Sequence, residues 1–501
     1  MAPRTPRSIS DRALVAWCAF ALFALVAWPL LVVHALPLQD LPNHLATEIV
    51  SRAPKQYPEY ISNGLFKTNS ALFLWLRVFG GLLGLESAAK VFVALVLAVS
   101  AFAWPRAAFV FGGRQRVLPA TLLAWPLVHS WFVCMGMLDY ALGAALGILL
   151  VCEVERSVRA RRPTLIVAGL AVCVWYTHAF ALGLAALFAL MLVTERVRKR
   201  ELTVKDALAF LSPLLLGLTL CAWSFTLQAS ESPVAEHALV RRPLWEVGYD
   251  LWALFGWAFT RREATSLVAV LALAALAVRP RESSVRAWML IALLGLYLAL
   301  PYETDAWFAV SVRVLPFLYL ACIARLPEKL PRSASAVLVA CALAYSIGLG
   351  LDYARLSTEV ERYASAAVPA ESRVLPLTFE PKGSSENTAP LAHAWGLYAV
   401  RDGAIVPPLV FGHSPSFPVS YRAPQAPPFD DLRYAAFLDT HASCASAVCE
   451  LDWADFWQRA LARFDRLIVW KAPPQVLARI PARYAKESDD GALRVYVRQP
   501  P

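Results

Sequence analysis

A few polar residues interrupt an otherwise apolar chain, and their types could carry acid–base or ion-binding chemistry. Asp40 and His44 lie one helical turn apart in the segment QDLPNHLA, where the pair could polarise an acceptor group or ligate a cation. Asp139 and Arg313 stand in apolar stretches, and a charged side chain in a membrane is costly unless it has a partner or a function. These four residues are the first candidates for a functional site.

Each candidate also has an ordinary structural explanation. Asp40 precedes a Leu-Pro pair and could simply cap a helix that has proline in its first turn. His178, in WYTHAF, could be an interfacial residue, and Asp305 could only solvate a loop. Arg241 and Arg242 could bind lipid head groups without any catalytic role. The chemistry therefore depends on which elements place these residues and where.

The composition indicates a membrane protein. The chain has 501 residues, of which 58% are hydrophobic and only 17% charged, whereas soluble domains are roughly 45–50% apolar and about 25% charged. A soluble multi-domain enzyme and a disordered chain are both excluded on this basis. The net charge of +10 arises before residue 353, so the chain has no basic tail, and nucleic acid is not an expected partner.

Apolar runs predict about eleven transmembrane helices. They are Ala13–Val33, Ala89–Phe111, Val117–Cys134, Met137–Cys152, Thr164–Tyr176, Ala179–Val193, Ala207–Leu227, Thr265–Val278, Ala287–Leu300, Trp307–Ile323 and Ala334–Leu351. The first run is too long for a secretory signal and is interpreted as an uncleaved helix. Two further apolar stretches, Asn69–Leu85 and Trp245–Phe259, are interpreted as helices lying in the outer membrane interface.

Basic residues set the predicted orientation, because connections rich in Lys and Arg stay in the cytoplasm. The basic connections are Arg106/Arg114/Arg116, Arg156/Arg159/Arg161/Arg162, Arg196/Arg198/Lys199/Arg200/Lys205, Arg279/Arg281/Arg286 and Arg325/Lys329/Arg332. We therefore expect a multi-pass protein of the inner (plasma) membrane with a cytoplasmic N-terminus. The unusual polar residues then share the outer side: Asp40, His44, Asp139, Tyr140, His178, Glu236, His237, Arg241, Arg242, Tyr302, Glu303, Asp305 and Arg313.

The sequence predicts a membrane domain of residues 1–352, followed by a small extracytoplasmic α/β domain of residues 353–501. Three strand-like runs, Arg373–Thr378, Arg466–Trp470 and Leu493–Val497, accompany a predicted helix at Asp455–Phe464. This domain could select an acceptor or merely cover the outer face. Cys444 and Cys449 could form a disulfide or remain two free thiols. His393 and His413 are too isolated in the sequence to be assigned.

Two short motifs carry a resemblance to a known family. Gln39-Asp40-Leu41-Pro42-Asn43-His44 places an acid directly after the first helix, and Leu138-Asp139-Tyr140 places a second acid at the turn between helices three and four. With interfacial helices in the first loop and an external C-terminal domain, residues 13–351 resemble the GT-C superfamily of integral-membrane glycosyltransferases. These are related to protein mannosyltransferases and aminoarabinose transferases. Arg313–Phe317 is similar to a recurrent element of uncharacterised bacterial members.

The resemblance implies a polyprenyl-phosphate sugar donor and a glycan, lipid or protein acceptor, both handled at the membrane. By resemblance, Asp40 is the candidate base and Asp139 orients the acceptor or assists Asp40. Arg313, with Arg241 or Arg242, would hold the donor phosphate. A divalent metal would suit the phosphate equally well, and no metal ligand is assigned. The substrate-binding candidates are His44, His178, Arg241, Arg242, Asp305 and Arg313.

Two other functions stay open from the sequence. A transporter would place its charged groups near the membrane midplane, on broken helices in two related halves. No such internal repeat is visible, and the polar set gathers on one predicted side, which favours an enzyme. A non-catalytic envelope assembly protein would use the same architecture without needing its outward acids.

Overall fold

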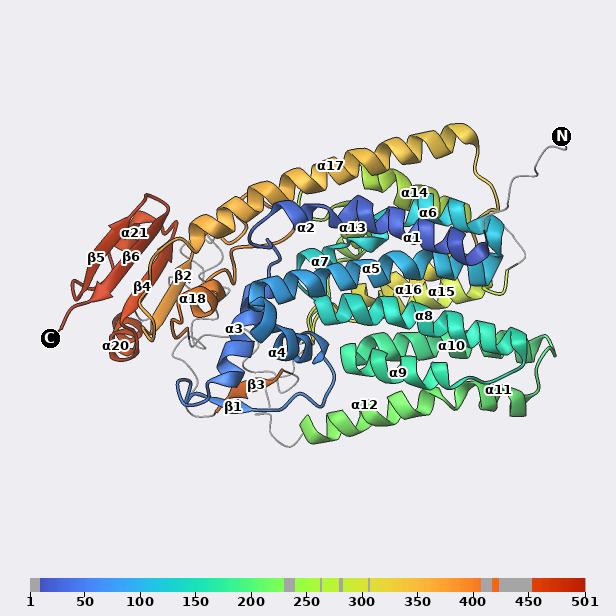
Figure 1. Ribbon diagram of the computed structural model, residues 1–501, viewed down its shortest axis with the longest axis horizontal. Helices are drawn as coiled ribbons and strands as arrows, with labels where there is room; N and C mark the ends of the chain where they lie inside the picture. The colour runs from blue at the N-terminus through green and yellow to red at the C-terminus, as the bar shows by residue number, and fades with distance from the viewer. Residues whose placement is uncertain are drawn as a thin grey trace. The chain divides into compact units, whose positions relative to one another are not determined.

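The computed structural model describes residues 10–228, 239–261, 264–278, 283–304, 307–406, 417–422 and 453–500 (Figure 1). The chain forms two compact units. The helical unit comprises Met1–Leu31, Phe92–Val133 and Leu138–Gly350, and the α/β unit comprises Val32–Val91, Cys134–Met137 and Leu351–Pro501. The helical unit ends at Gly350, and the α/β unit takes in the first loop and a four-residue turn as well as the C-terminal part.

Each predicted transmembrane run contains helix, which confirms the predicted fold class of a helical polytopic membrane protein. The corresponding helices are α1 (Asp11–Ala27), α2 (Pro29–Val32), α5 (Leu85–Gly112), α6 (Arg114–Val128), α7 (Trp131–Cys134), α8 (Leu138–Ala160), α9 (Leu165–Thr177), α10 (Ala179–Arg198), α11 (Val204–Leu211), α12 (Leu214–Gln228), α14 (Thr265–Val278), α15 (Ala287–Ala299), η2 (Ser311–Val314), α16 (Leu315–Ile323) and α17 (Arg332–Tyr363).

Length separates these helices into two groups. Five helical stretches of the described chain are long and apolar enough to cross a membrane, and the α11–α12 pair, bent by 55°, makes a sixth. Others, among them α9, α14 and α15, are apolar but have only 10–17 residues. The run predicted from Trp307 is shortened because Ala309 has a φ of 56°, so regular helix cannot start before Ser311.

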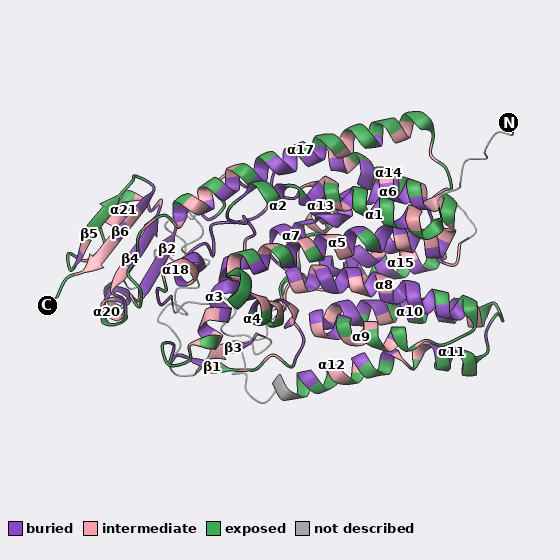
Figure 2. Cartoon of the chain, in the orientation of Figure 1, coloured by how far each residue is buried: buried purple, intermediate pink, exposed green. Residues whose placement is uncertain are grey.

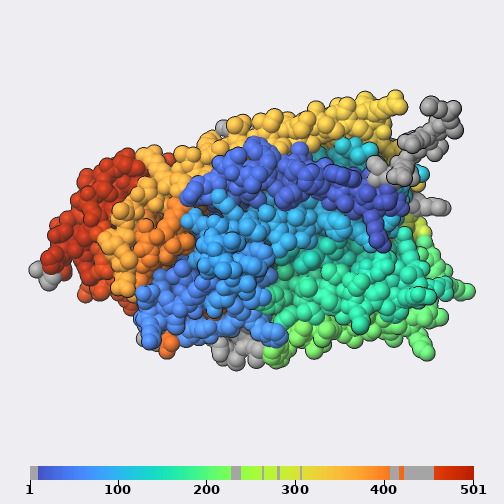
Figure 3. Space-filling model, viewed as in Figure 1, coloured from blue at the N-terminus to red at the C-terminus, as the bar shows by residue number. Residues whose placement is uncertain are grey.

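Exposed apolar side chains mark the faces that meet lipid. On α17 the exposed residues include Val337, Leu343 and Ile347, and this helix lies along the top edge in Figures 2 and 3. Several exposed large apolar side chains along one helix are uncommon in soluble proteins and typical of membrane contact. The two interfacial segments are helical as well, as α4 (Ala71–Leu83) and α13 (Leu244–Gly256).

The C-terminal part of the α/β unit holds a four-stranded sheet in the order β2-β4-β6-β5. Strands β2 (Val374–Thr378) and β4 (Arg466–Trp470) are parallel, whereas β6 (Leu493–Arg498) is antiparallel to β4 and to β5 (Tyr484–Asp489). Helix α20 (Trp453–Arg463) contributes Phe456 and Ala460 to a core with Leu467 and Val469. The three predicted strands and the helix are confirmed, whereas β5 is missed because its sequence YAKESD is largely polar.

Smaller elements complete this unit. Helix α3 (Leu41–Arg52) packs against α4 and against the short helix α18 (Gly396–Arg401). Strand β1 (Tyr60–Ser62) pairs antiparallel with β3 (Val419–Tyr421), and α21 (Pro474–Leu477) lies between β4 and β5 in the chain. Residues from opposite ends of the sequence thus share one folded unit. Cys444, Cys449 and His413 lie outside the described residues.

Candidate functional site

Asp40 stands at the N-cap of α3, yet its side chain makes no capping hydrogen bond. Pro42 lies in the first turn of this helix, where the lack of an N–H costs nothing. The carboxylate instead lies beside two nitrogen atoms. Its Oδ1 is 3.4 Å from Nε2 of Gln39 and 3.4 Å from Nε2 of His393. The capping explanation of Asp40 is therefore wrong for its side chain, which is directed at other polar groups.

The turn Cys134–Met137 holds the backbone on the other side of Asp40. The N–H of Gln39 donates to the Cys134 carbonyl, and the N–H of Asp40 donates to the Met135 carbonyl, both at 3.0 Å. Gly136 has a φ of +82°, and a Cβ there would lie 2.9 Å from the Asp40 nitrogen. Only glycine fits both the backbone conformation and this close approach.

His44 lies one turn into α3 and is enclosed by aromatic rings. Its ring meets Phe73 edge-on at 5.6 Å and stacks on Phe417 at 6.0 Å between centroids. Burial lowers the pKa of His44 to about 4, although the nearby Asp40 charge and a hydrogen bond with the Gly136 backbone act in the opposite direction. The imidazole is therefore neutral at physiological pH and suits hydrogen bonding or packing better than charge.

In the helical unit, Arg313 is the centre of a second polar group. Its side chain is buried, with Nη1 2.6 Å from Nε2 of His178 and Nη2 donating to the Phe308 carbonyl at 2.9 Å. The guanidinium also lies 5.3 Å and 5.4 Å from the ring centroids of Tyr140 and Trp307. The Tyr140 hydroxyl donates to the Arg313 carbonyl. Tyr140, His178 and Arg313, which are candidates from separate parts of the sequence, are thus in contact.

Helix direction explains why these residues converge. Tyr140 lies in the first turn of α8, His178 stands between α9 and α10, and Arg313 lies in η2 just before α16. The basic residues that follow α8 and end α10 lie at the other ends of the same helices, more than 15 residues away in each case. The sequence prediction that Tyr140, His178 and Arg313 share one end of the bundle is consistent with their contacts.

The polar group around Arg313 and His178 contains more hydrogen-bond donors than acceptors. Nδ1 of His178 lies 3.2 Å from the Phe180 N–H, while Nε2 faces the Arg313 guanidinium. A neutral imidazole accepts at one nitrogen only, so in either tautomer one N–H donor of the set has no acceptor. No carboxylate in the described parts of the chain forms an ion pair with Arg313. An anion placed here would supply both the charge and the missing acceptor.

The other predicted residues have different surroundings. Arg242 forms an ion pair with Asp250 and lies 3.6 Å above the Tyr302 ring, so its charge is already balanced. Arg241 is exposed, and Asp139 is half-buried in the first turn of α8. Asp305 lies outside the described residues, as do Glu236 and His237. Asp40 belongs to the α/β unit, and Asp139 belongs to the helical unit.

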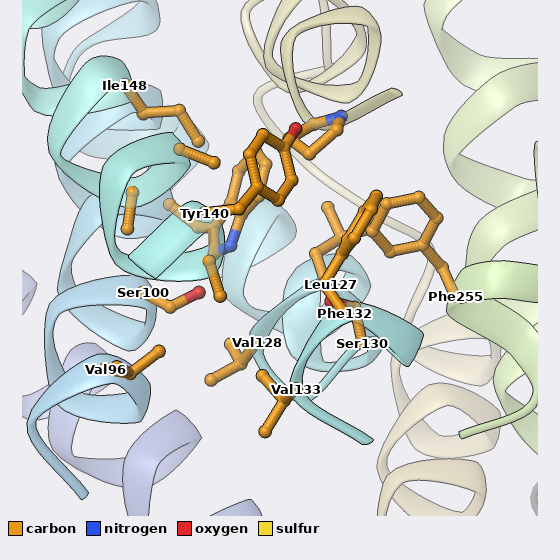
Figure 4. Close-up of a pocket in the computed structure, with 15 residues that line it drawn as sticks. Val96, Ser100, Leu127, Val128, Ser130, Phe132, Val133, Tyr140, Ile148 and Phe255 are labelled. Atoms are coloured by element: carbon orange, nitrogen blue, oxygen red, sulfur yellow. The ribbon is translucent and has the colours of Figure 1, made fainter. Parts of the chain in front are cut away.

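A small cavity lies beside Tyr140 in the helical unit (Figure 4). Ser100, Ser130 and Tyr140 line it together with apolar side chains such as Phe132 and Phe255. It has room for about one water molecule, far less than the several hundred Å³ of a typical ligand pocket. The cavity is therefore no sugar-binding site.

The described residues offer no ready metal centre. Among them, no group of three His, Cys, Asp or Glu side chains gathers in a way that could hold a metal ion. Seven cysteines of the described chain are free, and they belong to the predicted apolar runs, where they act as small apolar side chains. The pair Asp40 and His393, with its nitrogen–oxygen distance of 3.4 Å, is an acid–imidazole contact and not a ligand set.

Comparison with solved structures adds an independent finding about the fold. The chain is similar in fold to ArnT. The structure, described as ArnT from Cupriavidus metallidurans in the apo state, aligns with a TM-score of 0.51 over 96% of this chain and 97% of that chain. The sequences are 14% identical, so the similarity concerns the fold. No family model and no curated protein matches the chain.

The similarity to ArnT covers nearly the whole chain and so includes most of the C-terminal part. His393 was left unassigned because it stands alone in LAHAWG, more than 350 positions after Asp40. Its contact with Asp40 depends on α18 packing on α3, which no local pattern encodes. The only usable signal was the apolar, glycine-containing stretch around it, which indicates a buried segment and not a site.

Proposed function

We propose that the chain is an integral-membrane glycosyltransferase of the GT-C type. It would transfer a sugar from a polyprenyl-phosphate donor to a glycan, lipid or protein acceptor at the extracytoplasmic face of the inner membrane. The fold similarity to ArnT, an aminoarabinose transferase, supports the general class. The buried guanidinium of Arg313 is the observation that carries the proposal, since it points to a phosphate group at a membrane helix end.

A second buried arginine shows why Arg313 is unusual. Arg325 is also buried, but its Nε and Nη1 donate to the Ala277 and Val285 carbonyls at 2.9 Å and 3.0 Å. Backbone carbonyls therefore account for Arg325 as a structural residue. Arg313 donates to one carbonyl and otherwise faces an imidazole and two aromatic rings. A phosphate monoester or diester would accept from Arg313 and from His178 together, which suits the donor's phosphate.

Asp40 is the proposed general base. It would take the proton of the acceptor hydroxyl while that oxygen bonds to C1 of the sugar. The bond between C1 and the phosphate oxygen breaks, and the polyprenyl phosphate leaves with the electron pair. Arg313 would stabilise the negative charge of this leaving group. Asp139 is proposed to orient the acceptor, and His44 supports the base by packing behind it.

Arg241 and Arg242 keep supporting roles in this proposal, and Asp305 stays a substrate-binding candidate. Exposed Arg241 suits contact with the donor's outer phosphate oxygens or with lipid head groups. Arg242, already paired with Asp250, suits holding α13 in place. A divalent metal at the phosphate would supply charge stabilisation in addition to Arg313.

The test is to incubate the purified full chain with a panel of polyprenyl-phosphate sugars and to measure release of polyprenyl phosphate. We expect Arg313→Ala to raise KM for the donor by about 10- to 100-fold, because hydrogen bonds to a charged group contribute about 1.5–3 kcal/mol. Arg325→Ala is the matched control, and it should lower thermal stability while leaving KM of the folded fraction unchanged. Absence of turnover with every donor would contradict the proposed function.

A companion variant tests the base. Asp40→Asn should lower kcat by about 10²–10⁴-fold, as expected when a general base is lost. Its melting temperature should stay close to that of the wild type, because the Asp40 side chain makes no capping hydrogen bond. Near-normal turnover in this variant would remove Asp40 from the reaction and leave a transporter or an assembly protein as the better explanation.

A further inference from the structure

The two oxygens of the Asp40 carboxylate have different surroundings. Oδ1 lies 3.4 Å from Nε2 of both Gln39 and His393. Oδ2 makes no hydrogen bond within the described parts of the chain, and it is not among the fully buried polar atoms. The Asp40 side chain keeps 12% of its surface exposed. One oxygen is therefore held by the protein, and the other is left open to a ligand.

His393 can serve Asp40 only as a donor. A nitrogen facing a carboxylate carries the proton, so the neutral ring has its N–H at Nε2. Nδ1 of His393 is buried and has no hydrogen-bond partner among the described residues. Nε2 of the ring therefore faces Asp40 at 3.4 Å, and the ring makes no hydrogen bond within the described parts of the chain, which is unusual for a buried polar side chain that serves stability alone.

The segment around His393 packs closely on α3, the helix at whose N-cap position Asp40 stands. A Cβ on Gly396 would lie 2.2 Å from the Pro42 carbonyl oxygen, so α18 and α3 approach as closely as backbones allow. The Ala389 N–H donates to Oε1 of Gln39 at 2.8 Å. The Gln39 side chain thus links the segment around His393 to Asp40, because its Oε1 accepts from Ala389 and its Nε2 donates to Oδ1 of Asp40. The His393 ring and the Gln39 amide approach Oδ1 as a matched pair of donors.

We infer that His393 is a positioning residue, which with Gln39 fixes Oδ1 of Asp40 and so aims Oδ2 at the acceptor hydroxyl. This inference rests on the proposed function, in which Asp40 is the base. Its consequence is that the C-terminal part of the chain takes a direct share in the reaction by orienting the base. Two nitrogens facing one carboxylate oxygen favour one orientation about the Cβ–Cγ bond, so the proton transfer starts from a preferred geometry.

The experiment compares three variants of the full chain under saturating donor. His393→Phe keeps a ring of similar size but has no donor, and we expect kcat to fall by about 10- to 100-fold with KM for the donor nearly unchanged. His393→Gln places an amide N–H near the position of Nε2 and should recover most of kcat. Tyr398→Phe is the control and should leave kcat intact, because it removes only a hydrogen bond from Tyr398 in α18 to the Tyr363 carbonyl at the end of α17.

The outcomes separate this inference from the proposed function. Wild-type kcat in His393→Phe, with the wild type active, would overturn the positioning role alone. Equal losses in the Gln and Phe variants would also overturn it, because a merely structural ring explains that result. If His393→Phe fails to fold, His393→Asn replaces it, since its shorter amide cannot reach Oδ1. An inactive wild type would end the proposed function and this inference together.

Discussion

Replacing Gly136 by alanine tests whether the turn Cys134–Met137 sets the position of Asp40. The new Cβ would lie 2.9 Å from the Asp40 nitrogen, 3.0 Å from the Leu41 nitrogen and 3.1 Å from the Asp40 Cβ. Ordinary contact begins near 3.4 Å, so the start of α3 must retreat by about 0.5 Å. A functional group generally has to stay within about 0.5 Å of its productive position.

Two effects add up in the Gly136→Ala variant. Alanine at a φ of +82° costs about 1–2 kcal/mol of backbone strain. The retreat also weakens the two hydrogen bonds from Gln39 and Asp40 to the turn, each contributing about 1 kcal/mol. We expect the free energy of unfolding to fall by about 2–4 kcal/mol and kcat to fall by up to about 10²-fold, which is typical of a misplaced catalytic group.

Gly64→Ala is the matched control. Gly64 lies in the same unit with a φ of +72°, and a Cβ there would meet nothing within 4 Å. It therefore carries the backbone strain without the displacement of Asp40. Thermal unfolding in detergent and turnover of a donor found active with the wild type are measured for both variants. Equal stability and equal kcat in the two variants would refute the idea that the turn positions Asp40.

Two further predictions concern orientation and pH. In a cysteine-free background, Arg241→Cys should react with an impermeant thiol reagent from outside intact cells and Arg200→Cys only after permeabilisation; the reverse pattern would invert the predicted topology. Because burial holds the pKa of His44 at about 4, against 6.5 when unfolded, the unfolded chain takes up this proton first. The stability that His44 contributes is complete above about pH 6.5 and declines by about 3 kcal/mol as pH falls towards 4. The melting temperature should follow this window, and a His44→Leu variant with the same pH slope would show that another group is responsible.

Most elements of the fold could be predicted because their signals are local. Apolar runs such as Ala179–Val193 are long and continuous and hold a helix, whereas Val117–Cys134 and Ala207–Leu227 are each divided between two helices. The sheet was predicted where strands are buried, as in β4, and missed in β5, whose residues are mostly exposed. Boundaries failed where one residue changes the backbone, as Ala309 does before η2.

The candidate site was predictable only in part, for a physical reason. Asp40, Tyr140 and Arg313 are costly or unusual where they stand, so the sequence alone marks them. The partner of Asp40, His393, has no such mark, because its role arises from the packing of α18 on α3. A contact such as that between the His393 ring and Asp40 cannot be predicted from residue spacing, because the two residues are hundreds of positions apart.

The α/β unit combines segments from the first fifth and the last third of the chain, and this affects how it forms during synthesis. Gln39 and Ala389, which share a hydrogen bond, are separated by 350 positions. At about 5–20 residues per second, roughly 20–70 seconds pass between their syntheses. During this time β1 and α3 lack the partners that complete their fold. A chain released before its last quarter would carry Asp40 without His393, so premature termination would yield a protein that lacks the proposed positioning residue.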